Sequence, residues 1–199
     1  LLINPIRQVS IVFCIVSLVF SQDFAKVITV SSSVSSQNLS FGFSQYATDG
    51  YDEGSEPFEN DNNCSSTWQE GDTFFDLNGN DIQDVIDAYA PPAPPPPAFD
   101  AAFLVNAERY YNQIFYGDGD DSTEHEWPIS LQYAEDNIIT ITWNNTGWEG
   151  LGDFYLQDAF TGEMINIDMA DLDPADVNAM AGTLDTSDPS NPVLTLTSS

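Results

Sequence analysis

The chain has 199 residues, of which 32 are Asp or Glu and only 3 are Lys or Arg, so its formal net charge at pH 7 is −29. This charge excludes nucleic acid as a partner, because binding to a phosphate backbone needs a basic surface. Hydrophobic residues make up 42% and aromatic residues 13% of the chain, which is too apolar for a disordered acidic tail and enough to build a core.

An apolar segment near the N-terminus has the features of an export signal. Residues 11–20 are hydrophobic apart from one Ser, and Arg7 is the single basic residue before them. The segment is shorter than the roughly 20 apolar residues that a spanning helix needs, and Val19–Ser21 supply the pattern that a signal peptidase reads. We expect residues 1–21 to be a signal peptide cleaved before Gln22, with an uncleaved membrane anchor as the alternative.

Alternating apolar residues predict a β-rich fold. From Trp127 to Tyr133 every odd position is apolar, and the pattern resumes from Ile139 to Trp143 after a polar turn. Residues 127–143 are therefore predicted as one β-hairpin whose large side chains share a face. The same alternation predicts strands at Leu39/Phe41/Phe43, Phe99/Ala101/Phe103/Val105, Phe154/Leu156, Ile165/Ile167/Met169 and Leu194/Leu196, with Val27–Ser31 and Gln113–Tyr116 as edge strands.

Helix signals are confined to two places. Asp173 is expected to cap a helical stretch that has Pro174 at its first position and ends before Gly182. Ala107–Tyr111 are expected to form one short helical turn. The predicted fold class is mainly β, an antiparallel immunoglobulin-like β-sandwich with a long insertion and at most one or two short helices.

The predicted insertion covers residues 47–98 and lacks any alternating pattern. It ends in Pro91–Pro97, which hold half of the chain's 12 prolines. Proline cannot donate to a sheet ladder, so we expect an extended polyproline strap, with a docking peptide for a proline-reading domain as the alternative. The predicted organisation is a signal peptide (1–21), the first strands (22–46), the insertion (47–98) and the rest of a C-terminally truncated sandwich (99–199).

The best candidate site lies inside this insertion. Oxygen-bearing side chains fall at positions 1, 3, 5, 9 and 12 of the segment Asp76–Asp87, as in an EF-hand calcium loop. Position 6, normally Gly, is Asp81, and the alternative is an acidic turn in an acidic chain. The predicted calcium ligands are Asp76, Asn78, Asn80, Ile82 through its carbonyl, Asp84 and Asp87.

A second acidic cluster, residues 118–126, includes His125 but lacks the spacing of a metal site. A solvated loop is the favoured interpretation. No Ser or Cys motif marks a nucleophile beside His125. We therefore predict no catalytic residue and expect that the protein is not an enzyme.

The four Trp residues raise a carbohydrate-binding hypothesis, since exposed aromatic rings can stack on sugars. Trp127 and Trp143 fall on the predicted inward phase of their strands, whereas Trp148 and Trp68 lie in expected loops. Two loop rings are a weak signal, because one such ring at the rim of a sandwich is ordinary packing.

Several strings of the chain carry a family resemblance: Ala47–Asp52, Tyr89–Pro92, Phe99–Ala101, Ile141–Asn144 and Ile165–Met169. They resemble β-sandwich modules of secreted bacterial surface proteins, which often precede a sorting domain for type IX secretion. The segment from Gly54 to about Asp84 looks inserted relative to such modules. Its calcium-like loop resembles the loops of dockerins, which commonly end in Asp, although dockerins carry two loops.

These features together predict a noncatalytic structural, adhesion or binding module of a larger surface protein, secreted or held at the cell surface and stabilised by calcium. The expected partners are other domains of the same protein or an extracellular glycan or protein, with no nucleic acid and no stable membrane span after cleavage. The alternative is a carbohydrate-binding module accompanying a secreted polysaccharide-degrading enzyme.

Overall fold

The computed structural model describes residues 8–14, 24–44, 47–52, 87–117, 124–148 and 152–197, of which 8–14 are described by their backbone pairing. Within these ranges the chain is mainly β, as predicted, and its one helical segment is the 3-10 helix η1, Pro174–Asp176. The strands are β1 (Gln8–Cys14), β2 (Phe24–Ser31), β3 (Ser36–Ser44), β4 (Ala88–Tyr89), β5 (Asp100–Val105), β6 (Glu108–Tyr116), β7 (His125–Gln132), β8 (Ile138–Trp143), β9 (Asp153–Asp158), β10 (Asn166–Asp168), β11 (Gly182–Asp185) and β12 (Val193–Thr197).

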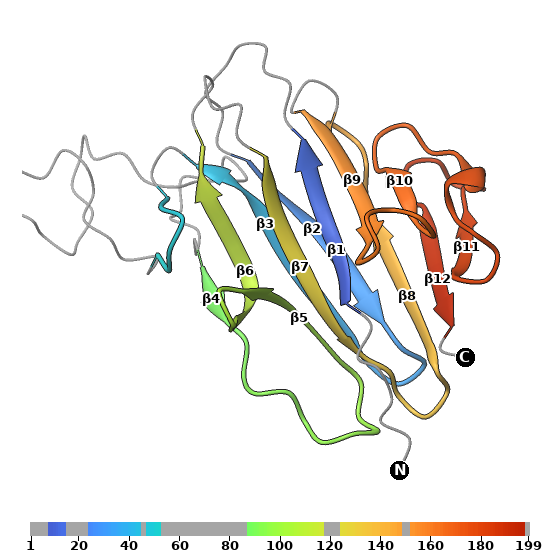
Figure 1. Ribbon diagram of the computed structural model, residues 1–199, viewed down its shortest axis with the longest axis horizontal. Helices are drawn as coiled ribbons and strands as arrows, with labels where there is room; N and C mark the ends of the chain where they lie inside the picture. The colour runs from blue at the N-terminus through green and yellow to red at the C-terminus, as the bar shows by residue number, and fades with distance from the viewer. Residues whose placement is uncertain are drawn as a thin grey trace, which may run out of the picture.

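The strands form one continuous sheet that curls into two facing layers (Figure 1). Its order is β10-β9-β1-β7-β5-β6-β3-β2-β8-β12-β11, and the short β4 pairs with β6 beside this path. β3 and β6 run parallel where the two layers join, whereas the other pairings between described strands are antiparallel. The sandwich-like fold is confirmed, with a mixed sheet in place of a wholly antiparallel one.

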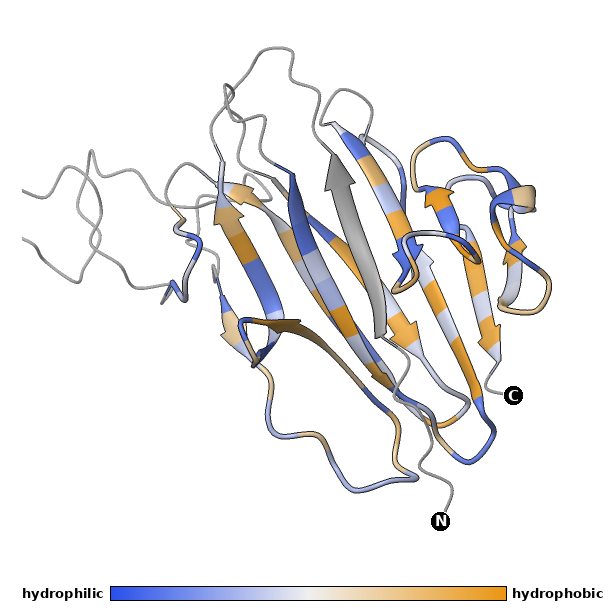
Figure 2. Cartoon of the chain, in the orientation of Figure 1, coloured by the Kyte–Doolittle hydropathy of each residue, from blue (hydrophilic) through white to orange (hydrophobic). Residues whose placement is uncertain are grey.

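The core lies between the layers and is filled by every second residue of the strands. Trp127 and Ile129 of β7 and Ile139 of β8 have no exposed surface, and Trp143 is 3% exposed. The ring of Trp127 packs against that of Phe41 from the opposite layer at a centroid distance of 5.6 Å. Figure 2 shows the alternation as hydrophobic and polar bands along the strands. The predicted inward phase of both segments is therefore confirmed.

The predicted hairpin over residues 127–143 is wrong, although both of its strands exist. β7 pairs with β1 and β5, whereas β8 pairs with β2 and β12, so the connection between them crosses from one layer to the other. Alternation determines which face of a strand is buried, but not which strand lies beside it. Two strands that each bury alternate residues can lie side by side in one layer or face each other across the core, and the sequence pattern is the same in both arrangements.

Two strands that were expected at an edge lie inside the sheet. β2 pairs with both β3 and β8, and β6 pairs with both β5 and β3. The helical turn predicted at Ala107–Tyr111 is also wrong, because Asn106 and Ala107 instead form the tight turn between β5 and β6. Their φ angles are 51° and 67°, and positive φ at both central residues is typical of hairpin turns that match the twist of the strands.

The helix start predicted at Asp173 is confirmed, but the helix is short. The Asp173 side chain accepts a hydrogen bond from the N–H of Ala175 at 2.8 Å, and Pro174 occupies the first turn. The helix ends at Asp176, and Gly182 begins β11 instead of terminating a longer helix. Close contact requires this glycine, since a Cβ on Gly182 would lie 2.2 Å from the carbonyl oxygen of Thr195 in β12.

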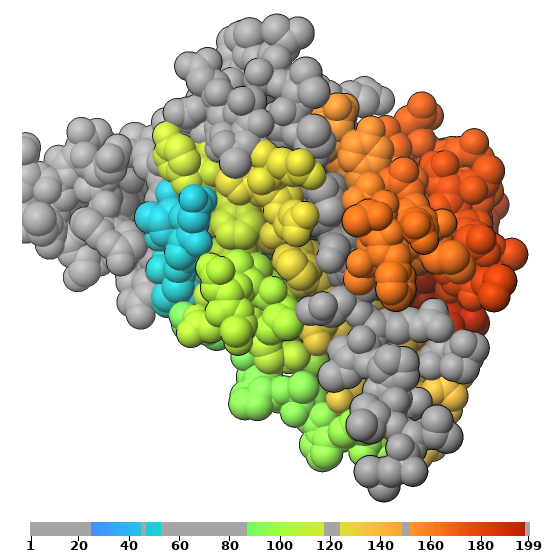
Figure 3. All heavy atoms as spheres, viewed as in Figure 1, coloured from blue at the N-terminus to red at the C-terminus, as the bar shows by residue number. Residues whose placement is uncertain are grey.

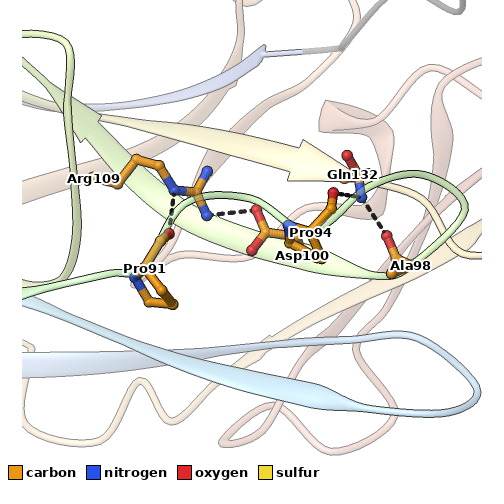
Figure 4. A network of polar contacts seen from close by, with 6 residues as sticks. All are labelled: Pro91, Pro94, Ala98, Asp100, Arg109 and Gln132. Atoms are coloured by element: carbon orange, nitrogen blue, oxygen red, sulfur yellow. Dashed lines mark hydrogen bonds and ion pairs between the residues drawn. The ribbon is translucent and has the colours of Figure 1, made fainter.

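The proline-rich segment 91–97 links β4 to β5 outside the sheet and is held by side chains of the neighbouring strands (Figure 4). Because a proline has no backbone N–H, each proline of the segment can form backbone hydrogen bonds only through its carbonyl oxygen. The hydrogen bonds run from Arg109 Nε to Pro91 O (3.0 Å), from Gln132 Nε2 to Pro94 O (3.0 Å) and Ala98 O (2.6 Å), and from Arg109 Nη2 to Asp100 Oδ2 (2.6 Å).

Candidate functional site

One of the six predicted calcium ligands, Asp87, lies in the described part of the chain. It stands immediately before β4. The other predicted ligands, which are Asp76, Asn78, Asn80, Ile82 and Asp84, lie outside the described residues.

Asp52 and Asp87, which lie on either side of segment 53–86, are hydrogen-bonded to each other. The N–H of Asp87 donates to the carbonyl oxygen of Asp52 at 3.3 Å, and the N–H of Asp52 donates to Asp87 Oδ2 at 2.9 Å. We call residues 47–52 and 87–90 the neck. Figure 3 shows residues 47–52 directly beside β6. The residues on either side of segment 53–86 are therefore close together, beside β6.

The first half of the neck is a turn that is closed by its own side chains. The N–H of Thr48 donates to Asp52 Oδ2 at 2.6 Å, and Thr48 Oγ1 donates to Asp52 Oδ1 at 3.0 Å. Thr48 Oγ1 also accepts from the N–H of Gly50 at 3.1 Å. Short polar side chains at this spacing favour turns, because they satisfy nearby backbone groups. The turn fixes the Asp52 carboxylate, which is 6% exposed, against the second half of the neck.

The Asp87 carboxylate is the centre of the neck. It is 2% exposed, and its Oδ1 accepts from the N–H of Ile114 in β6 at 2.8 Å. Its Oδ2 accepts from Asp52 N–H and, at 3.3 Å, from Gln113 Nε2. Position 12 of an EF-hand loop is normally a bidentate carboxylate. Binding calcium in that manner would require Asp87 to release donors that now join the neck to β6.

Burial raises the pKa of Asp87 to about 6, from an ordinary value of 3.8. The hydrogen bonds from the backbone N–H groups of Ile114 and Asp52 act against this rise, and the nearby Asp52 carboxylate adds to it. Gln113, which is 1% exposed, also donates from Nε2 to the carbonyl oxygen of Gly50 at 3.3 Å. Its amide thus bridges both halves of the neck from a position in β6.

We expect the Asp87 carboxyl to make folding stability depend on pH. A carboxyl group with a raised pKa in the folded state holds its proton more tightly there than in the unfolded chain. Its contribution is therefore fully present below about pH 4 and is lost as the pH rises through about 6. Denaturant unfolding should show that, between about pH 4 and pH 7, the free energy of unfolding falls by on the order of 2 kcal/mol more in wild type than in Asp87→Asn.

The control for this titration is Asp49→Asn, which changes an exposed carboxylate in the neck. It should reproduce the wild-type pH dependence, because both proteins retain Asp87 and nearly the same overall charge. Parallel curves for wild type and Asp87→Asn would contradict the assignment of this titration to Asp87.

The outer side of the neck carries a stack of three tyrosines. The rings of Tyr51 and Tyr89 lie 4.2 Å apart at an interplanar angle of 14°, and those of Tyr89 and Tyr110 lie 4.9 Å apart at 26°. Tyr51 and Tyr89 are 38% and 49% exposed, whereas Tyr110 of β6 is buried. This stack was not predicted from the sequence. The signal that could have indicated it is a Tyr close to each of the two Asp residues, in Tyr51-Asp52 and in Asp87-Ala88-Tyr89.

Trp148, which the sequence analysis placed in a loop and kept for sugar binding, has no exposed surface. Its ring packs against those of Phe41 and Phe154 at centroid distances of 6.1 and 5.0 Å, and its Nε1 donates to the carbonyl oxygen of Asn144 at 2.7 Å. Lys26 Nζ lies 5.8 Å from the centroid of this ring, and burial lowers the pKa of Lys26. The expectation of a free Trp148 is therefore wrong, and Trp68 lies outside the described residues.

His125 is part of an aromatic cluster. Its ring stacks on that of Phe115 at 5.3 Å and meets the ring of Phe43 edge-on at 4.8 Å. The acidic residues 118–123 that precede it in the chain lie outside the described residues. Within the described part, no three His, Cys, Asp or Glu residues are grouped so that they could hold a metal ion.

Comparison with known protein families, with curated proteins and with solved structures finds no match for this chain. No helix in the described ranges is long and apolar enough to cross a membrane.

Proposed function

We propose that the protein is a noncatalytic, exported structural or binding module of a larger surface protein, in which a β-sandwich holds a long acidic insertion. The observation that carries this proposal is the reciprocal hydrogen bonding between Asp52 and Asp87. Hydrogen bonds from Ile114 and Gln113 of β6 to Asp87, and from Gln113 to Gly50, hold both halves of the neck against the sheet. Binding residues often lie on loops that a rigid scaffold holds in place.

Charge and the N-terminal segment support the extracellular part of this proposal. The apolar leader has the character of a signal peptide, and all 32 acidic residues follow it. So acidic a surface favours solubility and the binding of cations over anionic partners. The expected partners are accordingly neighbouring domains, or an extracellular protein or glycan.

Calcium binding by the insertion is the second part of the proposal. Asp76, Asn78, Asn80 and Asp84 would supply side-chain oxygens and Ile82 a carbonyl oxygen, which are the ligands that calcium prefers. Asp87 is engaged in the neck, so the loop would lack a bidentate ligand at position 12. Loops of extracellular modules bind calcium with dissociation constants of roughly 10⁻⁴–10⁻³ M, and we expect this weak range here.

Millimolar calcium should raise the melting temperature by several degrees, because a ligand that binds only the folded protein stabilises it. Asp76→Asn should abolish the shift in a calorimetric melt, since it neutralises the first ligand of the loop. Asp61→Asn, which removes a charge from the insertion outside the loop, should retain it. Equal melting of wild type in calcium and in chelator would reject calcium binding and leave the scaffold proposal standing.

A carbohydrate-binding module is the alternative function. The observation that favours it is the exposure of Tyr51 and Tyr89 in the neck, since tyrosines at a wet surface can pack against a sugar and hydrogen-bond to it. A glycan array that is positive for wild type and negative for Tyr89→Ala would support this alternative. Trp148 no longer counts in its favour.

A further inference from the structure

β1 lies between β7 and β9 and links them (Figure 1). Its residues 8–13 pair with β7, and its residues 9–14 pair with β9. β7 and β9 do not pair with each other, and the other neighbour of β9 is the three-residue β10. We call the position between β7 and β9 the slot. Whatever fills the slot joins β9 and β10 to the rest of the sheet.

The register shows what kind of strand the slot accepts. Ile11 pairs with Trp127 on one side and with Leu156 on the other, and both partners are completely buried. The neighbouring position, Ser10, pairs with Pro128 and Gln157, which are partly exposed. The slot therefore requires an apolar residue at alternate positions and tolerates a polar residue between them.

Removal of the leader would take β1 away from this slot. The expected signal peptide covers residues 1–21 and includes all of β1, Gln8–Cys14. The facing edges of β7 and β9 would then lose their backbone partners. Buried N–H and C=O groups without partners are costly, so an empty slot beside buried Trp127 and Leu156 is an unfavourable state.

We propose that in the exported protein the slot is an acceptor site for a β-strand donated by another polypeptide. β1 itself shows the chemistry of the donor, which is extended, antiparallel to both neighbours, uncharged and apolar at every second position. Addition of a strand to open sheet edges is an established mode of protein recognition. The net charge of the chain further disfavours an acidic donor. This inference rests on the export and cleavage contained in the proposed function.

The first test is the mass of the full chain after export from a bacterial host. A product that begins at Gln22 is the expected result. An exported product that still contains residues 8–14 would overturn the acceptor site, because the chain would fill its own slot. The proposed extracellular module would survive that outcome, so the two proposals fail separately. A protein that is not exported would reject both.

The second test uses the cleaved protein and a capped peptide with the sequence of residues 8–14 and Cys14→Ser. Hydrogen exchange should be fast in β7 and β9 relative to β2 and β8, and the peptide should slow it at least about tenfold in those two strands. If the cleaved protein does not fold alone, the readout is the refolding yield, which the peptide should raise. Protected β7 and β9 in a monomer without peptide would overturn the proposal.

Matched peptides test the register. Ile11→Asp places a charge at the position between Trp127 and Leu156 and should abolish binding. Ser10→Asp adds the same charge at the position between the partly exposed Pro128 and Gln157, and this peptide should retain most of the binding. Equal binding by both variants would contradict a specific strand site. The oligomeric state of the cleaved protein distinguishes two donors. If the donor is a second copy of this chain, the cleaved protein will form oligomers that the wild-type peptide dissociates. If the donor is a different protein, the cleaved chain will remain monomeric and bind the peptide.

Discussion

Asp87→Ala should lower the free energy of unfolding by about 3 kcal/mol, which would place it among the most damaging single substitutions in the described part of the chain. The substitution leaves the N–H groups of Ile114 and Asp52 without their acceptor and removes one of the two acceptors of the Gln113 amide. Each unsatisfied buried donor costs roughly 1–3 kcal/mol. Part of this loss is offset because the variant no longer buries a carboxylate. Urea unfolding at neutral pH measures the difference.

The matched control for this prediction is Asp49→Ala, which removes an exposed carboxylate from the same turn. Its effect should stay within about 0.5 kcal/mol, as is usual for surface substitutions. A loss of less than about 1 kcal/mol for Asp87→Ala would show that the neck does not depend on this carboxylate. Limited proteolysis adds a second readout, since cleavage within the insertion should become faster only in Asp87→Ala.

The role of Asp87 in the neck also determines how calcium binding must be tested. A variant that combines Asp76→Ala with Asp87→Ala would melt at a lower temperature whether or not the loop binds calcium. The neck would be lost in either case. Asp76→Asn leaves the neck intact and changes only the loop, so its response to calcium can be interpreted.

The strands could be predicted from the sequence because each buries one phase of an alternating pattern. Ile129 and Ile139 illustrate this, since both were assigned to the core from spacing alone and neither has any exposed surface. Their pairing could not be predicted in the same way. The sequence between β7 and β8 is compatible with a hairpin or with a crossing between layers, and only the packing of the whole core selects the crossing.

The contacts of Asp87 could not be predicted from the sequence. Asp87 was assigned to calcium because its spacing from Asp76 matches a loop position, yet its described contacts are all with the neck and β6. Gln113, 26 residues away in the chain, gives no local signal of this contact. Long-range partners of buried polar groups depend on topology, which a spacing rule does not contain.

β1 shows a different limit of sequence reasoning. Residues 8–14 satisfy two patterns at once, since they precede and enter an apolar leader and they also alternate as a strand. Export and sheet formation both select hydrophobic residues. In the exported protein proposed above, β1 cannot remain part of the chain, because cleavage before Gln22 removes residues 8–14.

Trp148→Ala is expected to lower the free energy of unfolding by about 3–5 kcal/mol, the range for truncating a large buried aromatic side chain. The indole contacts Phe41 and Phe154 in the core and bonds through Nε1 to Asn144. Its removal leaves a cavity between the layers and takes the aromatic face away from Lys26. Phe160→Ala is the matched control, because this ring is 70% exposed and its loss should cost little.

Denaturant unfolding and a glycan-binding assay together distinguish a core role of Trp148 from a role in sugar binding. A core residue changes stability and leaves the affinity of the folded fraction for any glycan unchanged, whereas a sugar platform does the reverse. We expect the first pattern, with Trp148→Phe recovering part of the lost stability because it refills most of the volume. A stable Trp148→Ala protein that had lost glycan binding would contradict the core role of this ring and would favour the carbohydrate-binding alternative.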